Sequence, residues 1–386
     1  MPKVLRIINR FNLGGPTYNA AYLTKYLSPE FETLLIGGAK DDTEESSEFI
    51  LKNLGVDYRI ISEMKHPVNL MDDYSAYKKI KKIIREFKPD IVHTHAAKAG
   101  ALGRWAAFAC DVPVIVHTFH GHVFHSYFGK LKSTFYKSIE RNLARKSSAI
   151  VAISEIQKHE LTSIHKIASS DKVHVIPLGF DLKRFNQNHE EKRISFRTKY
   201  NLEEDEIAIG IVGRLVPVKN HVLFLEAIKY SKQNSTKKIK AFVIGGGEEM
   251  KNLISLTSRL KLNDSVIFTS WEKEVDKVYP GLDIVCLTSF NEGTPVSLIE
   301  AQAASKPIVS TNVGGIENVV IPDITAFLSD VSDKETFWKN LLKLINEDTL
   351  RNEMSKKGWN HVHEKFGYIR LQSDMKKLYN DLMKQT

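Results

Sequence analysis

Short apolar runs alternate with amphipathic stretches along most of the chain, which is the pattern of βα units in parallel sheets. The first series of runs predicts strands near residues 3–9, 33–37, 90–94, 113–118, 149–153 and 173–176. Helical spacing is found between them, near residues 16–27, 45–54, 75–87, 98–109, 131–146 and 154–166. A second series predicts strands near residues 207–215, 240–247, 266–270, 283–289 and 307–312. The sequence therefore predicts two α/β units of the same kind.

The two series are separated by residues 183–206, a polar and charge-rich segment with little apolar periodicity. We interpret this segment as an interdomain linker, which gives an N-terminal domain over 1–183 and a C-terminal domain over 184–366. Open α/β sheets bind ligands at the carboxyl ends of their strands, and the cleft between two such domains is the expected site.

The formal charge of +9 is concentrated in the first half of the 386-residue chain. Residues 1–180 carry 25 Lys and Arg against 18 Asp and Glu, so anionic partners are expected there. The basic helical stretch 77–89 is either the solvated face of a core-packed helix or a surface attracted to anionic lipid heads. It lacks the interleaved aromatic residues of a nucleic-acid motif, so no nucleic-acid partner is predicted.

Features of the chain also predict its compartment. No run of about 18 uncharged apolar residues is present that could span a bilayer. Residues 1–15 lack the cleavage site of a signal peptide and are predicted to form a strand of the mature protein. Cys110 and Cys286 are too few for a disulfide framework. A cytoplasmic protein with reduced cysteines is therefore expected, and the basic stretch would make it peripheral on the inner face of the plasma membrane.

The stretch SFNEGTPVSLIE (289–300) combines the end of a strand, a loop and the start of a helix. Pro295 suits the first helical position, and the free N–H groups at a helix start suit a phosphate. Gly293 lets the backbone approach a ligand. Glu292 would stand at the mouth of the cleft, and Glu300 could accept hydrogen bonds from a diol such as a ribose. Taken singly, each acid is better explained as a solvated helical side chain or a loop cap than as a functional residue.

The loop in GIVGRLVPVKN (210–220) carries two cations: Gly213 ends a strand, and Arg214 and Lys219 follow it. A diphosphate leaving group needs its developing charge stabilised, either by a metal ion or by fixed cations and helix N-termini. Because no Asp-x-Asp sequence stands at a strand end to hold Mg²⁺, we favour fixed cations and predict no metal.

Two further glycine turns follow predicted strands. Gly245 lies in VIGGGEEM (243–250), and Gly14 and Gly15 lie in RFNLGGPTYNA (10–20). Each of these two glycine-rich segments, taken alone, is typical of a tight turn. In a cleft, either segment would admit a phosphate or a sugar. Neither completes the G-x-G-x-x-G pattern of a dehydrogenase with its ribose-binding acid.

Ten of the 14 histidines precede residue 181. His117, His120, His122 and His125 crowd residues 116–125, and His93 and His95 would share one strand face. A metal site is disfavoured because no carboxylate is interleaved and no Cys is near. His120, directly after a strand, is the histidine best placed to touch a substrate hydroxyl or assist proton movement.

Taken together, several motifs resemble those of the retaining GT-B glycosyltransferases of the family 4 type, which build bacterial surface polysaccharides. The motifs are Glu292-x₇-Glu300, GRLVPVKN (213–220), GGP (14–16), VHTFHGHVF (116–124) and VIPLGFD (175–181). The resemblance covers nearly the whole chain. It implies two Rossmann-like parallel-sheet domains facing a cleft, with a last helix, 367–386, returning to the N-terminal domain.

The resemblance also implies roles for the candidate residues. Arg214 and Lys219 would hold the donor diphosphate, Glu300 the ribose, and His120 would lie beside the donor sugar. The remaining donor contacts would come from Glu292, Gly293, Thr294, Pro295, Val296, Gly14, Gly15, Gly213 and Gly245. His120, Glu292, Arg214 and Lys219 would be the catalytic set, and HTHAAKAG (93–100), with Lys98, would face the acceptor. Ser305 departs from the Gly common at the end of the Glu300 helix.

The expected activity is metal-independent, retaining transfer of a hexose or N-acetylhexosamine from a nucleotide diphosphate. UDP is expected on family habit, and the acceptor would be lipid-linked or a glycan. No cofactor is expected beyond the nucleotide sugar itself. The alternatives are a GT-B epimerase or hydrolase acting on the nucleotide sugar, and a non-catalytic nucleotide-sugar-binding protein.

Overall fold

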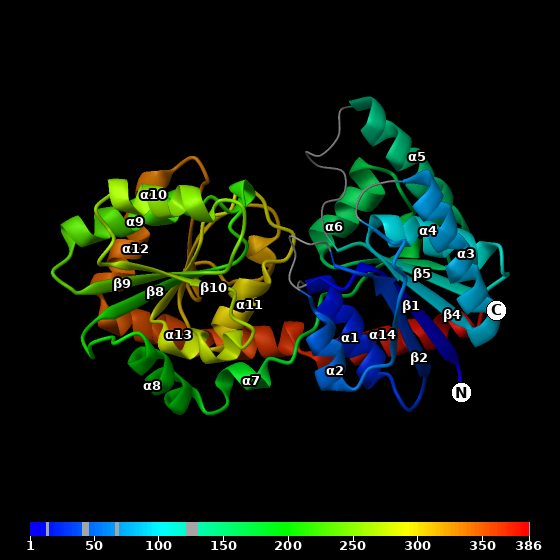
Figure 1. Ribbon diagram of the computed structural model, residues 1–386, viewed down its shortest axis with the longest axis horizontal. Helices are drawn as coiled ribbons and strands as arrows, with labels where there is room; N and C mark the ends of the chain where they lie inside the picture. The colour runs from blue at the N-terminus through cyan, green and yellow to red at the C-terminus, as the bar shows by residue number, and fades with distance from the viewer. Residues whose placement is uncertain (13–14, 41–45, 66–68, 121–129, 386) are drawn as a thin grey trace. The chain divides into compact units, whose positions relative to one another are not determined.

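The computed structural model describes residues 1–12, 15–40, 46–65, 69–120 and 130–385. It divides into two compact units (Figure 1), the first formed by Met1–Phe180 with Phe366–Thr386 and the second by Asp181–Lys365. Each unit is a parallel sheet covered by helices on both faces, which is the layering that the alternating strand and helix patterns predict.

In the described part of the chain, the first sheet has seven parallel strands in the order β3-β2-β1-β4-β5-β6-β7. Their bounds are Lys3–Arg10 (β1), Glu32–Gly38 (β2), Tyr58–Ile60 (β3), Ile91–His95 (β4), Val114–Thr118 (β5), Ala149–Ala152 (β6) and Val173–Val175 (β7). The order reverses between β1 and β4, so the loops that follow these two strands diverge at a topological switch point.

Alternating residues of β1 face the two helical layers of this unit. Leu5 and Ile7 pack with helices α3 (Leu70–Phe87) and α4 (Ala97–Phe108). Val4 packs on the other face with helices α1 (Gly15–Tyr26) and α14 (Tyr368–Met383). The remaining helices are α2 (Glu48–Leu54), α5 (Lys130–Lys146), α6 (Glu155–His159) and a π-helical turn (Glu160–Ile164).

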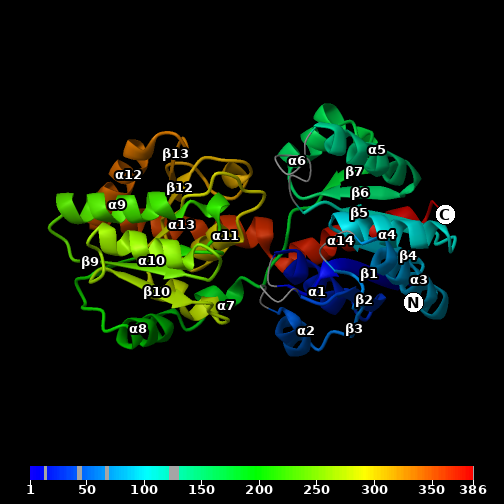
Figure 2. The same ribbon diagram turned by 45° about the horizontal axis from the view of Figure 1, so that its top comes forward.

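The C-terminal helix α14 completes the first unit although its residues follow the whole second unit in sequence. Its buried side chains are Leu371, Met375, Leu378, Tyr379 and Leu382. They join residues of β1, β4, β5 and β6 in one apolar cluster. Figure 2 shows the ribbon of α14 within this first unit. The expected return of the last helix to the N-terminal fold is thus confirmed.

The second sheet, in the described residues, has six parallel strands in the order β10-β9-β8-β11-β12-β13. Their bounds are Ile207–Val212 (β8), Ile239–Ile244 (β9), Val266–Ser270 (β10), Ile284–Leu287 (β11), Ile308–Thr311 (β12) and Ala326–Ser329 (β13). The helices that follow β8 along the chain include α9 (His221–Asn234), α10 (Met250–Arg259), α11 (Val296–Ala303), α12 (Lys334–Asn346) and α13 (Asp348–Phe366). Here the order reverses between β8 and β11.

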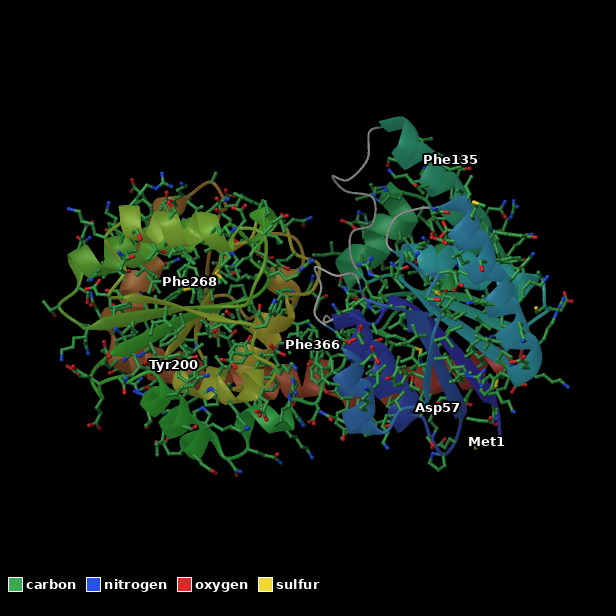
Figure 3. All side chains as sticks on the ribbon, viewed as in Figure 1. Met1, Asp57, Phe135, Tyr200, Phe268 and Phe366 are labelled. Atoms are coloured by element: carbon green, nitrogen blue, oxygen red, sulfur yellow. The ribbon has the colours of Figure 1, made fainter. Side chains whose placement is uncertain are left out.

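The prediction of a linker over 183–206 is wrong for most of that segment, which forms helices α7 (Lys183–Asn186) and α8 (His189–Lys199). Helix α8 lies on the sheet of the second unit, where the rings of Phe196 and Tyr200 contact Phe242. Figure 3 labels Tyr200, which directly follows this helix. The sequence conceals this helix because Phe196 is its one buried side chain.

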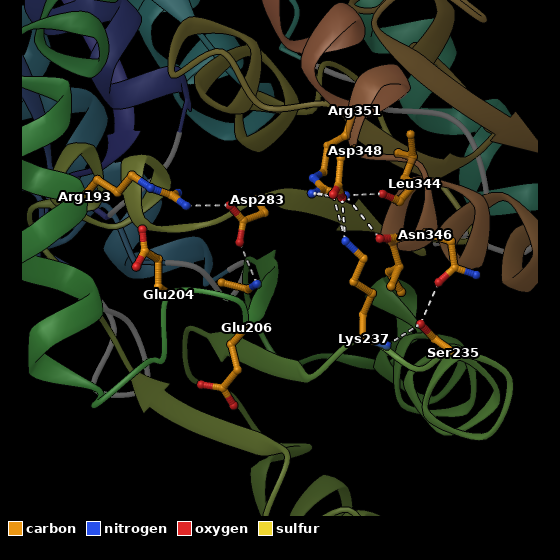
Figure 4. Close-up of polar contacts among 12 residues, drawn as sticks. Arg193, Glu204, Glu206, Ser235, Lys237, Asp283, Leu344, Asn346, Asp348 and Arg351 are labelled. Atoms are coloured by element: carbon orange, nitrogen blue, oxygen red, sulfur yellow. Dashed lines mark hydrogen bonds and ion pairs between the residues drawn. The ribbon is translucent and has the colours of Figure 1, made fainter.

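Ion pairs hold α8 at the amino edge of the second sheet. Arg193 donates a hydrogen bond to Asp283 Oδ1 (Figure 4). Arg197 donates to Asp283 Oδ2, which also accepts from the N–H of Ala208. Two of the charges that suggested a solvated linker therefore pair with a residue that directly precedes β11.

Helix α3 buries Ala76, Ile80 and Ile84 and leaves Lys78 and Lys82 exposed, so the basic stretch is the outer face of a core-packed helix, and any attraction to lipid stays a prediction. Among the described residues, no helix has both the length and the apolar character needed to cross a membrane. Cys110 and Cys286 are both free thiols.

Candidate functional site

Two loops meet at the switch point of the second sheet. One follows β8 and carries Arg214 and Lys219, and the other follows β11 and carries Glu292. Thr288 Oγ1 donates a hydrogen bond to the carbonyl of Lys219 at 2.9 Å, and the N–H of Phe290 donates to the carbonyl of Val218 at 2.8 Å. Because ligands of open α/β sheets bind where the strand order reverses, these loops define a candidate site.

Lys219 and Glu292 form an ion pair in this site. The distance from Lys219 Nζ to Glu292 Oε1 is 2.5 Å, and Ser289 Oγ donates to the same oxygen at 2.6 Å. The side chains of Lys219 and Glu292 are only 20% and 9% exposed. Its carboxylate is thus largely covered, because a lysine and a serine neutralise and satisfy it, and the place of Glu292 at the mouth of a cleft stays a prediction.

The side chain of Arg214 is exposed. The loop that carries Arg214 packs against the glycine turn that follows β9. A Cβ atom on Gly245, whose φ is +139°, would lie 1.9 Å from the carbonyl oxygen of Gly213. The N–H of Leu215 donates to the carbonyl of Gly246 at 2.9 Å. Gly245 thus has a packing role that shapes the Arg214 loop, and its predicted contact with a ligand stays a prediction.

Helix α11 begins beside this pair. Pro295 is the N-cap residue and Val296 the first helical residue, one position later than predicted. Gly293 and Thr294 are partly exposed in the loop before it. The helix ends without its expected glycine, since Ser305 itself takes the left-handed conformation with φ of +55°.

A third loop, after β12, was missed by the sequence reasoning. A Cβ on Gly314 would lie 2.0 Å from the carbonyl oxygen of Glu292, and a Cβ on Gly315 would lie 1.8 Å from the carbonyl oxygen of Gly293. The N–H of Gly315 donates a hydrogen bond to the carbonyl of Glu292 at 3.0 Å. The glycine pair two residues after the end of the predicted strand 307–312 was the signal that could have identified this support.

Glu300 has a hydrogen-bond partner of its own, separate from the Lys219–Glu292 pair. Its Oε2 accepts a hydrogen bond from the hydroxyl of the buried Tyr279 at 3.1 Å. Burial raises the pKa of Glu300 to about 7, and the nearby charge of Arg184 opposes that rise. Tyr279 and Arg184 were not predicted, because neither lies in a recognisable motif.

The switch point of the first sheet, between β1 and β4, holds the other candidates. Gly15 opens helix α1, and Gly14 lies outside the described residues. After β4, Ala96 takes φ of +65° and the chain turns directly into α4. Lys98, expected on the acceptor side, is 13% exposed and pairs with Asp73 at 2.5 Å.

His120 follows β5 and is hydrogen-bonded to a second histidine. Its Nε2 lies 2.8 Å from His95 Nδ1, and burial lowers the pKa of His120 to about 4. His93 and His95 do share a strand face, with ring centroids 4.2 Å apart. Among the described residues no three His, Cys, Asp or Glu side chains form a group that could hold a metal ion, while His122 and His125 lie outside those residues.

Two doubly wound parallel sheets, with a C-terminal helix that returns to the first, define the GT-B class of glycosyltransferases. The profile "Glycosyltransferase Family 4" matches residues 13–184, and "Glycosyl transferases group 1" matches residues 192–361. The chain belongs to glycosyltransferase family 4, and it is a glycosyltransferase of the GT-B fold.

Curated relatives cover most of the chain. It is 30% identical over 322 residues to the Escherichia coli UDP-Gal:alpha-D-GlcNAc-diphosphoundecaprenol alpha-1,3-galactosyltransferase, which covers 82% of this chain and 81% of that enzyme. It is 26% identical to the Staphylococcus aureus capsular polysaccharide biosynthesis glycosyltransferase CapM, over 84% of this chain and 85% of CapM.

Solved structures agree in fold. Anabaena HepE in complex with UDP superposes with a TM-score of 0.82 at 18% identity, covering 98% of this chain and 100% of HepE. Sucrose-phosphate synthase from Thermosynechococcus elongatus superposes with a TM-score of 0.80 at 17% identity, covering 100% of both chains. At these identities the likeness establishes the fold alone.

Proposed function

We propose that this glycosyltransferase transfers a hexose or N-acetylhexosamine, with retention and without a metal ion, from a UDP-sugar to a lipid-linked or glycan acceptor in surface-polysaccharide synthesis. The nucleotide and the acceptor class are supported by the E. coli relative, whose name specifies UDP-galactose and a diphosphoundecaprenol-linked sugar. CapM, named for capsular polysaccharide biosynthesis, supports the pathway class.

The observation that carries the proposal is the switch-point arrangement of the second unit. The covered Lys219–Glu292 pair, the exposed Arg214 and the start of α11 all belong to loops at the carboxyl edge of β8 and β11. Arg214 would bind the diphosphate through its planar guanidinium, and the free N–H groups of α11 add donors and a partial positive charge. Glu300 would accept hydrogen bonds from the ribose hydroxyls.

In the proposed reaction, the bond between the sugar C1 and the phosphate oxygen breaks as the acceptor oxygen bonds C1 on the same face. The acceptor proton passes to the departing phosphate, so no side chain is required as a general base. Arg214, Lys219 and the α11 N-terminus stabilise the charge that develops on the diphosphate. Glu292 and the Gly293–Val296 backbone would position the sugar, and His120 would contact it.

The assignment is tested by Arg214→Ala and Lys219→Ala, with the exposed Arg259→Ala in the same unit as the control. Losing a charged hydrogen bond costs about 1.5–3 kcal/mol, so kcat/KM should fall roughly 10- to 100-fold. Arg214→Ala is the cleaner variant, because Lys219→Ala also leaves Glu292 unpaired. Wild-type turnover in both variants would refute the site.

Stereochemistry and metal independence have direct readouts. NMR of the product should show an α-anomeric linkage from an α-linked UDP-sugar, and EDTA should leave the rate unchanged; inversion or loss of activity would refute the corresponding part. UDP-sugar incubated without acceptor should stay intact. Isomerised or free sugar would instead identify an epimerase or hydrolase, and stoichiometric binding without turnover would identify a binding protein.

Peripheral membrane binding through α3 at the cytoplasmic face is a separate part of the proposal. Leu70 and Met71 at the start of the helix are each 84% exposed, and exposed lysines follow them. Replacing Lys78, Lys79, Lys81 and Lys82 by Gln should weaken binding to anionic vesicles, whereas Lys356→Gln with Lys357→Gln on α13 should not. Unchanged vesicle binding in the α3 variant would exclude this surface.

A further inference from the structure

A buried polar cluster lies between β1, β4, β5 and α14, and its hydrogen bonds determine where the protons are. Arg6 Nη2 donates to the hydroxyl of Tyr379 at 3.3 Å, and that hydroxyl lies 2.6 Å from His93 Nδ1. A guanidinium can only donate, so the Tyr379 hydroxyl accepts from Arg6, and the buried hydroxyl proton finds a partner when it is donated to His93 Nδ1. His93 must then donate from Nε2 to Thr118 Oγ1, 2.7 Å away.

The neighbouring pair, His95 and His120, has no such external donor. His95 Nδ1 and His120 Nε2 lie 2.8 Å apart, and burial lowers the pKa of both rings, so both are neutral at pH 7. A single proton therefore lies between them. The outer nitrogens, His95 Nε2 and His120 Nδ1, are buried and have no hydrogen-bond partner among the described residues.

Two arrangements are compatible with this geometry, and burial distinguishes them. If His120 donates, the orphan N–H is His95 Nε2, in a side chain with 0% exposure. If His95 donates, the orphan N–H is His120 Nδ1, in a residue that is partly exposed and follows the end of β5. A buried donor without a partner is costlier than a buried acceptor, so the N–H belongs on His120, the residue nearer the surface, although its Nδ1 is itself covered in this structure.

We propose that His95 is a positioning residue: it donates from Nδ1 to Nε2 of His120 and thereby fixes His120 with its proton on Nδ1. His120 then presents a hydrogen-bond donor, not a base, to an oxygen of the bound sugar. The role at the sugar rests on the proposed function, whereas the proton position rests on the two rings alone.

The backbone holds His95 in place for this task. It is the last residue of β4, paired in register with Thr118 of β5. The next residue, Ala96, takes the strained φ of +65° that turns the chain into α4. The ring of His93 contacts that of His95 from the same strand, at 4.2 Å between centroids. His95 therefore has little freedom to rotate away from His120.

The test is the position of the proton on His120, read by long-range ¹H–¹⁵N NMR of protein labelled with ¹⁵N-histidine. The His120 signals are assigned by their loss in His120→Gln. Wild type should show a protonated Nδ1 and a bare Nε2. His95→Asn places an amide N–H where Nδ1 was and should preserve this state, whereas His95→Leu should give an Nε2-protonated or mixed state. Nε2 protonation in wild type, or an unchanged His120 in a folded His95→Leu variant, would overturn the proposal.

Activity provides the second readout. In His95→Leu, kcat/KM for the UDP-sugar should fall roughly tenfold, about the value of one lost hydrogen bond, and His95→Asn should restore most of it. Equal losses in both variants would overturn the positioning role. If no donor is turned over at all, the proposed function fails while the NMR result still decides the proton position. If His95→Leu does not fold, wild type and His95→Asn decide it by NMR.

Discussion

Glu300 offers a direct test of how burial controls the candidate site. The perturbation is Glu300→Gln, which keeps the shape of the side chain and an oxygen to accept from Tyr279 but removes the titration. Burial raises the pKa of this carboxyl from 4.5 to about 7. The folded state therefore binds the proton more tightly than the unfolded state does, and the contribution to stability is complete below about pH 4.5 and is lost as the pH rises to about 7.

The magnitude follows from the size of the shift. Each pKa unit corresponds to about 1.4 kcal/mol, so the full shift corresponds to about 3 kcal/mol. Because Glu300 is partly and not fully covered, solvent screening reduces this value, and we expect about 2 kcal/mol. Glu300→Gln should match wild type at pH 4.5 and should be more stable by about 2 kcal/mol at pH 8.

Urea unfolding at the two pH values, followed by tryptophan fluorescence, measures this difference. Trp271, Trp338 and Trp359 all lie in the second unit, with only Trp105 in the first, so the signal reports mainly on the unit that contains Glu300. Subtracting wild type from variant cancels the opposite pH dependence of the buried histidines. Glu353→Gln on the exposed face of α13 is the control. A difference that does not change between pH 4.5 and pH 8 would refute the reasoning.

Two further predictions concern packing. Arg104→Met should destabilise the first unit by about 3 kcal/mol, because it leaves the carboxylate of Glu140, 2.6 Å away, buried without its partner. Fluorescence of Trp105 in a chain whose Trp271, Trp338 and Trp359 are replaced by Phe measures the unfolding, and a loss below about 1 kcal/mol would contradict this. Gly314→Ala should lower the free energy of unfolding by about 3 kcal/mol, because its new Cβ would lie 2.0 Å from a backbone oxygen. Gly55→Ala has a similar φ, but its nearest atom is 3.8 Å away, so it should lower the free energy of unfolding by only about 1 kcal/mol. Equal losses in the two variants would exclude the steric cause.

The predicted strands correspond to long apolar runs, which is why both sheets were expected from sequence. Strands β3 and β13 were missed; both are edge strands of their sheets, and two of the three residues of β3 are exposed, so no buried apolar run marks it. Helix α8 was missed because its stability comes from tertiary contacts, the ring of Phe196 and the ion pairs to Asp283, and not from an apolar face of its own.

The candidate site was only partly accessible to sequence reasoning for a similar reason. Motifs identified Lys219 and Glu292 as separate elements, but their contact spans 73 residues and depends on β11 pairing with β8, a topological fact that no local pattern contains. The hydrogen bond between His95 and His120 likewise requires β4 beside β5.

The Lys219–Glu292 pair also determines how charge is distributed in the proposed donor site. With Lys219 neutralised by Glu292 at 2.5 Å, Arg214 is the cation of the loop that carries its full charge toward a diphosphate. Glu292→Gln would leave Lys219 unpaired in a covered site, and a covered cation gains from any anion that compensates it. UDP should therefore bind roughly tenfold more tightly to Glu292→Gln in low salt, measured by calorimetry, although sugar transfer falls. Adding Lys219→Met should abolish the gain. Unchanged or weaker UDP binding in Glu292→Gln would mean that the ion pair does not lie where the diphosphate binds.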